Sequence, residues 1–346
     1  MTNRISFLKS KKLLLSFQTG RGLRKQISNY NKIKDPFFVI GVQGCLHLLD
    51  LFLRFVPEDE NIILFSSGMD EWELNWAKEN LKIKGIVSIS TQIKHGNILD
   101  YLFTYRKSNF GIMDYDLYIA QPDYFKRLRK IQSSSLGTAL FKYDDPNLGL
   151  AIPQTHAMFF NTSLVRKLRR EYGVKCKNSN YENLSPKIRR SLLQIGVDGT
   201  HYPEEKFFKN YFDTTRVLSL LGIANGYYFD FLNTASENDI EKSGVFHVGG
   251  VSDPRVTKNR WRVRGSYFWQ LVLMNQKDLE LRDYYSRLFG VLAPIDELRE
   301  LLEQDGFTSS SFFTSVDSLI EKISIPNQLQ NIISQSVNFH DDRYLC

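Results

Sequence analysis

Two aspartates, Asp114 and Asp116, stand one residue apart inside the otherwise apolar stretch GIMDYDLYI at residues 111–119. The stretch predicts a buried strand, with both carboxylates toward the carboxyl end of its GIMDY part. Carboxylates at this spacing repel each other, and burying them without a partner is costly. A divalent cation removes both penalties, and oxygen ligands suit Mg²⁺ or Mn²⁺ with a phosphate-bearing ligand completing the coordination. The alternative is a tight turn in which the carboxylates accept hydrogen bonds from backbone amides.

The elements around this stretch predict an α/β fold with a mostly parallel sheet. Apolar, β-branched segments predict four strands, at residues 36–43, 61–65, 86–90 and 111–119. Segments with helical spacing follow the first three, at residues 45–56, 71–81 and 95–107. This alternation is typical of parallel strands covered by helices on both faces. Ligands of such sheets bind beyond the carboxyl ends of the strands, where the aspartate pair would lie.

The pattern divides the chain into a basic arm (1–34), an α/β body (35–265) and a helical extension (266–346). The body ends with less regular elements, among which PEEKFFKNYF (203–212) and DTTRVLSLL (213–221) predict consecutive helical segments. The extension contains the helical stretches SYFWQLVLMNQ, APIDELRELLEQ and VDSLIEKI.

Charge is unevenly distributed along the chain. The net charge is +7, yet residues 1–34 contain nine Lys and Arg and no Asp or Glu, which leaves 36 basic and 38 acidic residues elsewhere. The body therefore lacks the basic excess of a nucleic-acid-binding protein. The arm is either attracted to an anionic membrane surface, as a peripheral contact, or is a solvated tail.

The sequence carries no clear targeting or membrane-spanning signal. No apolar run approaches the roughly 18 residues of a transmembrane helix, and the apolar part of MTNRISFLKSKKLLLSF is shorter than that of a signal peptide. The three cysteines lie far apart, which argues against a disulfide framework or a cysteine metal cage. We expect a cytoplasmic protein, and the arm leaves open a peripheral position at the cytoplasmic membrane face.

The order of the motifs resembles that of nucleotide-sugar-dependent glycosyltransferases of the GT-A fold, the family-2-like enzymes with a D-x-D motif. The resemblance covers roughly residues 36–253 and rests on the stretches FSSGMD, KHGNILDYLF, GIMDYDLYI, FFKNYFDTTRVLSLLGIANGYYF and FHVGGVS. It implies a catalytic domain over residues 35–265, with a nucleotide-sugar half at about 35–120 and an acceptor half at about 121–265.

The resemblance also implies a role for individual residues. The ligands of Mn²⁺ or Mg²⁺ would be Asp114, Asp116 and His247. The nucleotide sugar, with a UDP-sugar favoured, would contact Gly41, Val42, Ser67, Asp70, His95, Gly96, Asp114, Tyr115, Arg255 and Lys258. The acceptor, a glycan or another hydroxyl compound, would contact His156 and Glu205.

The implied reaction transfers a hexose or N-acetylhexosamine, with displacement of a nucleoside diphosphate, in glycan or polysaccharide biosynthesis. In an inverting enzyme Asp213 would deprotonate the acceptor hydroxyl, whereas a retaining enzyme needs no such base. The sequence leaves both outcomes open. Inverting relatives usually carry Glu-Asp where this chain has Phe212-Asp213, and Glu204 and Glu205 are rival carboxylates.

Several of these residues also have a purely structural explanation. His247 fits a turn packed against two glycines, His95 fits a helix cap, and His156 is better explained as a buried core histidine. Asp213 precedes two threonines and fits a helix N-cap.

The basic segment DPRVTKNRWRVRG (253–265) has two interpretations. It either folds over a leaving diphosphate, with Arg255 and Lys258 as the contacts, or forms a solvated strand whose alternate arginines share one face.

Two other function classes remain. A nucleotidyltransferase shares the sheet and the aspartate pair, but VIGVQGCLHLL lacks the basic residue expected in its triphosphate loop. A non-catalytic nucleotide-binding or scaffold protein would show binding that depends on the basic arm and on salt. A dinucleotide-dependent dehydrogenase is disfavoured because no G-x-G-x-x-G follows the first strand.

Overall fold

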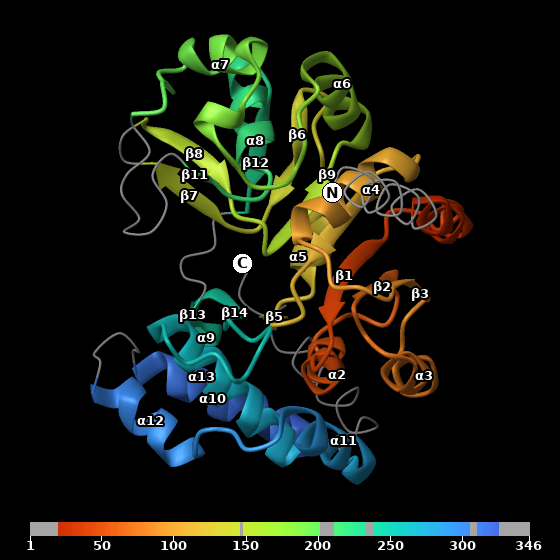
Figure 1. The fold of residues 1–346 in the computed structure, drawn as a ribbon, viewed down its shortest axis with the longest axis vertical. Helices are drawn as coiled ribbons and strands as arrows, with labels where there is room; N and C mark the ends of the chain where they lie inside the picture. Colours follow the sequence, from red (N-terminus) through yellow and green to blue (C-terminus); the bar gives the residue numbers. More distant parts are fainter. Residues whose placement is uncertain (1–19, 146–147, 201–210, 233–237, 305–309, 325–346) are drawn as a thin grey trace, which may run out of the picture. The chain divides into compact units, whose positions relative to one another are not determined.

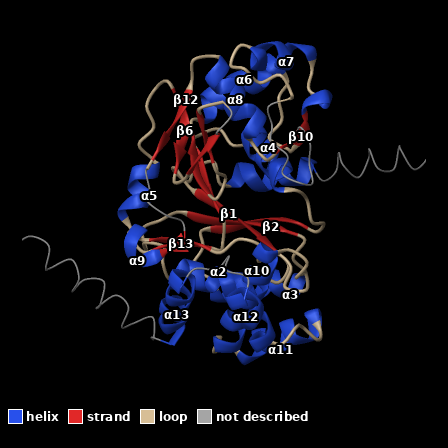
Figure 2. Ribbon diagram, turned by 90° about the vertical axis from the view of Figure 1, so that its left-hand side faces the viewer, coloured by secondary structure: helices blue, strands red, loops and turns tan. Residues whose placement is uncertain are grey.

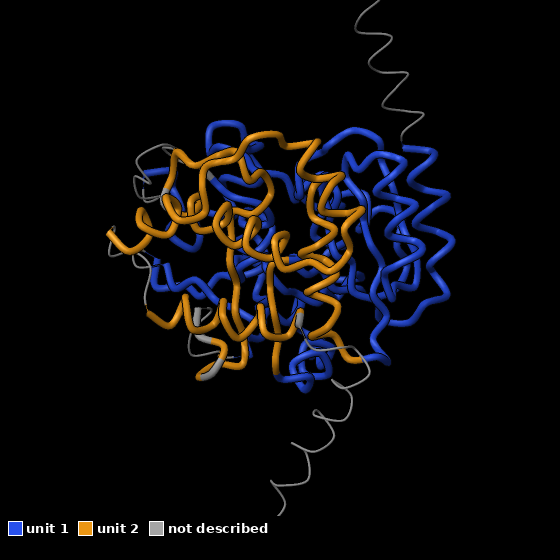
Figure 3. Tube along the Cα trace, turned by 90° about the horizontal axis from the view of Figure 1, so that it is seen from below, with its two compact units in different colours: residues 1–43, 58–115, 121–235 blue, residues 44–57, 116–120, 236–346 orange. Residues whose placement is uncertain are grey.

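The computed structural model describes residues 20–145, 148–200, 211–232, 238–304 and 310–324. The chain forms two compact units, each assembled from three segments (Figure 3). Unit 1 comprises residues 1–43, 58–115 and 121–235, and unit 2 comprises residues 44–57, 116–120 and 236–346. One boundary between the units therefore falls inside the D-x-D motif, between Tyr115 and Asp116.

Unit 1 is built on a seven-stranded sheet (Figure 1, Figure 2). In spatial order its strands are β12 (Tyr228–Phe231), β6 (Ser135–Ala139), β9 (Ala157–Phe160), β4 (Phe110–Met113), β1 (Phe37–Val42), β2 (Ile62–Ser67) and β3 (Gly85–Ile89). Strand β9 is antiparallel to β4 and β6, and the other four pairings are parallel. The predicted α/β fold with a mainly parallel sheet is confirmed.

Successive residues of a strand point to opposite faces of a sheet. On one face of this sheet, the side chains of the strands pack against helices. Phe38 and Ile40 of β1 lie in one buried cluster with Ile63 and Phe65 of β2. The helices that contribute to the cluster are α4 (His95–Tyr105), α6 (Thr162–Tyr172), α7 (Pro186–Leu193) and α8 (Arg216–Ala224). Burial of each large apolar side chain contributes roughly 1.5–3 kcal/mol. This shared core fixes α4 and α8 against the sheet.

Residues 20–29 form a helix that packs on unit 1, although their charge had grouped them with the basic arm. Leu23 and Ile27 are buried in the core cluster. The Gln26 side chain accepts from the Ser88 N–H (2.7 Å) and donates to the Ser88 carbonyl (3.1 Å), on the edge strand β3. A polar side chain thus satisfies backbone groups that an exposed strand edge would leave unpaired. Residues 1–19 of the predicted arm lie outside the described residues.

The stretch GIMDYDLYI is two strands and not the single strand that its apolar character predicted. Strand β4 ends at Met113, and β5 (Leu117–Ile119) pairs with β14 (Val245–His247) in a separate sheet of unit 2. The turn between them contains both aspartates. Tertiary pairing decides this break, because each half of the stretch is equally apolar.

Unit 2 contains the three-stranded antiparallel sheet β13-β14-β5, with β13 at Asn238–Asp239, and a set of helices. Its helices are α2 (Leu46–Leu53), α9 (Ile240–Ser243), α10 (Arg260–Asn275), α11 (Leu279–Phe289), α12 (Ile295–Gln304) and α13 (Ser310–Ser324). Trp269 of α10 and Tyr285 of α11 are buried against His47 of α2. None of the helices in the described part of the chain has the length and apolar character that crossing a bilayer requires.

Helix α10 begins at Arg260, six residues earlier than predicted, so the alternating arginines do not form a strand. Two of them bind backbone carbonyls of the loop after β14. Arg264 Nε donates to the Val248 carbonyl (2.9 Å), and Arg262 donates to the Gly250 carbonyl (3.2 Å). These contacts attach the first turns of α10 to that loop.

The remaining elements belong to unit 1. They are α3 (Glu71–Asn80), α5 (Asp123–Leu128), the hairpin β7 (Lys142–Asp145) and β8 (Leu150–Pro153), β10 (Ser179–Asn180), the 3₁₀ turn at Tyr181–Asn183, and β11 (Tyr211–Phe212). Strand β11 pairs with β10, so the described end of PEEKFFKNYF is a strand where a helix was predicted. Residues 201–210 lie outside the described residues.

Candidate functional site

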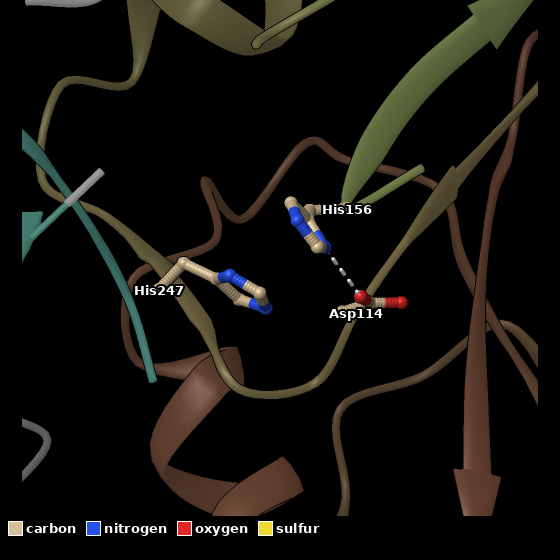
Figure 4. A group of neighbouring side chains, drawn as sticks. All are labelled: Asp114, His156 and His247. Atoms are coloured by element: carbon tan, nitrogen blue, oxygen red, sulfur yellow. Dashed lines mark hydrogen bonds and ion pairs between the residues drawn. The ribbon is translucent and has the colours of Figure 1, made fainter. Parts of the chain in front are cut away.

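Asp114 directly follows β4, at the edge of the sheet where the parallel strands β1 and β2 also end. Its carboxylate lies 3.1 Å from Nδ1 of His156 (Figure 4). Its backbone N–H donates to the His156 carbonyl at 2.8 Å. The antiparallel pairing of Met113 with Ala157 places the two residues side by side. Both side chains are about one quarter exposed. A ligand that reaches this edge therefore meets a carboxylate and an imidazole together.

His95 is the first residue of α4 and lies close to this pair. Burial lowers the pKa of its imidazole, while the carboxylates of Asp114 and Asp213 raise it and His156 lowers it further. The net direction is downward, so the ring is neutral at neutral pH. Nε2 of His95 is shielded from solvent and forms no hydrogen bond with any described residue. A neutral imidazole with an unused nitrogen thus stands beside two carboxylates.

A close contact positions the start of α4. Gly96 lies against the backbone of the segment that contains Cys176 and Lys177, where an added Cβ would come within 2.4 Å of the Lys177 Cα. Asp100, one turn further along α4, accepts the Cys176 N–H at 2.9 Å and pairs with Arg169 at 2.8 Å. The 176–177 segment is therefore bound to α4 by both packing and hydrogen bonds.

The same segment positions the residues before α8. The Cys176 carbonyl accepts the N–H of Thr215 at 2.8 Å. Thr215 has a φ of 63°, which is unusual for a β-branched residue, and its buried hydroxyl has no partner among the described residues. Local strain of this kind is common at functional sites and must be supported by surrounding contacts.

Asp213 is exposed, and one of its oxygens accepts the Thr214 N–H at 2.7 Å. The expected N-cap role is wrong, because the N-cap of α8 is Thr215, whose side chain makes no capping hydrogen bond. The carboxylate is not used to start the helix. It lies near His95, as the effect on the pKa of that imidazole shows.

The second aspartate of the motif has its own histidine, within unit 2. Nε2 of His247 lies 3.6 Å from Oδ1 of Asp116, and Oδ2 of Asp116 accepts the Gly249 N–H at 2.9 Å. Pairing of β14 with β5, which sets His247 opposite Leu117, brings these groups together. Both side chains are less than 10% exposed. The D-x-D motif thus provides two carboxylate–histidine pairs, one in each unit.

Several residues predicted to contact the donor lie at the ends of the parallel strands. Gly41 and Val42 end β1, and Ser67, which ends β2, pairs with Val42. The Ser67 hydroxyl accepts the Ile93 N–H at 2.9 Å and so attaches the segment before α4 to the sheet. Asp70 forms a capping box with Glu73 at the start of α3.

The other predicted residues are dispersed. Tyr115 is buried in the turn between the aspartates. In unit 2, Arg255 forms a two-point ion pair with Asp253. Hydrogen bonds from the Arg255 guanidinium lower the pKa of the Asp253 carboxyl. Lys258 is exposed. Glu204 and Glu205 lie outside the described residues.

Sequence reasoning missed two features of the site. The pairing of His156 with Asp114 depends on the register of β9 against β4, and nothing local to QTHAMFF reveals it. The strained Thr215 also has no sequence signal beyond its position after Asp213. Both depend on contacts between residues distant along the chain.

Comparison with known proteins gives a partial match that includes this edge of unit 1. Residues 17–165 match the family model for the StrH glycosyltransferase N-terminal domain. A curated relative, the dTDP-dihydrostreptose–streptidine-6-phosphate dihydrostreptosyltransferase of Streptomyces griseus, is 29% identical over 94 residues, or 27% of this chain. The match spans about a quarter of that relative (24%). This part of the chain is therefore glycosyltransferase-like in sequence, and it contains His95, Asp114 and His156.

Among solved structures, the chain resembles the glycosyltransferase GlyE of Streptococcus pneumoniae TIGR4. Sequence identity is 11% over 74% of this chain and 64% of that one, with a TM-score of 0.37. The apo form of the same protein gives the same identity and TM-score over 75% and 65% of the two chains.

Proposed function

We propose that this protein is a glycosyltransferase of the GT-A kind that transfers a sugar from a nucleoside-diphosphate sugar to a hydroxyl group. The observation that carries the proposal is the grouping of His95, Asp114, His156 and Asp213 at one edge of a mainly parallel sheet. Three of these residues lie within the segment that is glycosyltransferase-like in sequence. That edge is where open α/β sheets bind their ligands.

In this proposal Asp114 and Asp116 hold Mn²⁺ or Mg²⁺, with His247, the neighbour of Asp116, as a third ligand. The carboxylate oxygens of the two aspartates fit such an ion, and each carboxylate has an imidazole nitrogen within 3.1–3.6 Å. A bound divalent ion would neutralise charge on the leaving diphosphate. The donor would contact Nε2 of His95 and the ends of strands β1 and β2 at Gly41, Val42 and Ser67.

Asp213 is proposed to act on the acceptor. In the inverting form of the reaction, its carboxylate takes the proton of the acceptor hydroxyl while that oxygen bonds to the anomeric carbon and the diphosphate leaves. The Thr214 N–H, bound to one carboxylate oxygen, holds the group in place. Because the His95 imidazole is neutral, it would not give a proton to the Asp213 carboxylate, which could then accept the proton of the acceptor hydroxyl.

The test is ligand-dependent thermal stability, followed by an assay for transfer. The panel contains UDP, dTDP, GDP and their sugars, each with Mn²⁺, Mg²⁺ or EDTA; dTDP is included because the name of the curated relative specifies a dTDP-linked sugar. A ligand that binds only folded protein raises the midpoint with concentration. We expect a metal-dependent rise with one base, and release of that nucleoside diphosphate when an acceptor is added.

The matched variants are Asp114→Ala and Asp144→Ala. Asp144 is an exposed carboxylate of the same unit, paired with Lys142 on the β7 strand. We expect Asp114→Ala to lose the metal-dependent shift and Asp144→Ala to keep it. Equal behaviour of the two variants, or no shift with any nucleotide in folded protein, would refute the proposed site.

A further inference from the structure

A pocket of about 250 Å³ opens on unit 1, and neither Asp114 nor Asp213 belongs to its lining. Its lining comes from the end of α6 at Tyr172, the following segment, the start of α7 at Ser185, and Val217 of α8. A volume of this size holds a group such as a phosphorylated sugar more readily than a large ligand. Neither the metal nor the donor proposed above accounts for it.

The charge of the lining is one-sided. Lys175 and Lys177 both line the pocket and are exposed, and the described lining residues include no Asp or Glu. Lys187 differs from them, because its ammonium already binds the Glu171 carbonyl at 2.7 Å and lies 4.6 Å from the centre of the Tyr172 ring. Lys175 and Lys177 thus line one small space, and neither forms an ion pair with another residue that the structure describes. Compact ammonium groups of this kind are common ligands of phosphate.

Neutral polar groups also line the pocket, together with the apolar side chains of Val174, Leu184, Ile188 and Val217. Ser179, Asn183 and Ser185 provide hydroxyl and amide groups beside the lysines. Helix α7 begins at Pro186, so the positive end of its dipole adds to the lysine charges. The last turn of α6, at Tyr172 and Gly173, offers carbonyl oxygens that helices leave unbonded at their ends. The pocket therefore suits an anion attached to a group with hydroxyls.

The pocket adjoins the proposed acceptor side of the site. Lys177 is packed against Gly96, next to His95, at the start of α4. The carbonyl of its neighbour Cys176 accepts the Thr215 N–H. Thr215 lies two residues after Asp213 and two residues before the pocket residue Val217. The same short segments thus form the wall of the pocket and support the candidate base.

We propose that this pocket binds a phosphate group carried by the acceptor, through Lys175 and Lys177. The proposal rests on the proposed glycosyltransferase function, which it extends by naming phosphorylated hydroxyl compounds as the acceptor class. The phosphate is held unchanged, and the sugar is transferred to a hydroxyl on the same molecule.

The test measures binding of inorganic phosphate, glucose 1-phosphate, glucose 6-phosphate and glucose by calorimetry. We expect at least one sugar phosphate to bind about tenfold more tightly than inorganic phosphate, and glucose to bind more weakly than either. In the variant Lys175→Gln/Lys177→Gln the tighter binding falls at least about tenfold. In the control Lys187→Gln, whose ammonium is already engaged, it changes less than twofold.

Two results would overturn the inference. Equal affinity for sugar phosphates and inorganic phosphate would mean that the pocket holds only a free anion. Unchanged affinity in the double lysine variant would place the phosphate elsewhere. Nucleotide binding separates this inference from the proposed function, because the lysine variant should keep the metal-dependent nucleotide shift, and Asp114→Ala should lose that shift but keep phosphate binding.

Discussion

Two histidines in different units, His47 and His95, each have a ring nitrogen that is shielded from water, but the two side chains have different roles. His47 lies in unit 2 among aromatic rings, with its ring centre 4.6 Å from that of Trp269. Burial lowers the pKa of its imidazole to about 3, opposed only by the hydrogen bond to the Trp269 carbonyl. Burial also lowers the pKa of His95 in unit 1, but there Asp114 and Asp213 act in the opposite direction.

The difference shows that burial alone does not mark a functional histidine. His47 has an apolar surrounding and one backbone partner, so its role is to fill and orient the aromatic core. Each ring has one buried nitrogen without a described hydrogen-bond partner, but His95 also has two nearby carboxylates, which is the feature of a group that awaits a ligand. The neighbours of an imidazole therefore distinguish the two roles.

The largest expected effect comes from Asp213→Asn, which removes one of the carboxylates that distinguish His95 from His47. The amide oxygen can still accept the Thr214 N–H, so stability should change by less than about 0.5 kcal/mol. Loss of a general base should lower kcat about 10²–10⁴-fold. Steady-state kinetics with thermal unfolding of the same samples measures both. Full activity would exclude Asp213 as the base, and a retaining mechanism would then be favoured.

The two histidines should respond oppositely to replacement by alanine. His47→Ala opens a cavity in the aromatic core, and we expect it to lower the free energy of unfolding by about 2–4 kcal/mol with kcat within twofold of wild type. His95→Ala should lower the free energy of unfolding by less than about 1 kcal/mol and reduce kcat/KM about 10–100-fold. Urea unfolding and kinetics of both variants test the pair. If both variants lost only stability, the distinction between the two imidazoles would be wrong.

The pH dependence of stability should also reflect His47. Its pKa is lower in the folded protein (about 3) than in the unfolded chain (6.5), so below pH 6.5 the unfolded state binds a proton that the folded state excludes. Stability therefore falls as the pH drops from 6.5 toward 3. At pH 5 the His47 imidazole alone should lower the free energy of unfolding by about 2 kcal/mol relative to pH 8.

The check is the variant His47→Gln, which keeps a hydrogen-bond donor for the Trp269 carbonyl but cannot be protonated. Its loss of unfolding free energy between pH 8 and pH 5 should be about 2 kcal/mol smaller than that of wild type. Parallel pH profiles for the two proteins would contradict the assignment of His47 as a buried neutral imidazole.

The smallest effect concerns the backbone that carries His95. In Gly96→Ala the added Cβ would overlap the Lys177 backbone, and we expect a loss of about 1–3 kcal/mol with a rise in KM as α4 shifts. Gly22→Ala is the matched control, because the Cβ added to that helical glycine would meet no described atom within 4 Å outside the adjoining backbone of its own helix. It should stabilise the protein by about 0.5–1 kcal/mol and leave KM unchanged. A neutral Gly96→Ala would show that the packing of α4 does not position the site.

Much of unit 1 could be predicted from its sequence. Continuous apolar runs indicated β1, β2 and β3 to within two residues, and helical spacing indicated α3, α4 and α8. These signals are local, because the spacing of apolar residues along a buried strand or helix is visible in that segment's own sequence. The edge strand interaction of Gln26 with Ser88 has no such signal, since its partners are 62 residues apart.

The sequence alone determined that two carboxylates stand at the carboxyl end of a buried strand, and that histidines and a later aspartate follow. Tertiary structure decided which of these groups meet. Pairing of β9 with β4 brings His156 to Asp114, and pairing of β14 with β5 brings His247 to Asp116. Strand register between distant segments depends on the total burial that each alignment achieves, and no short stretch of residues contains that information.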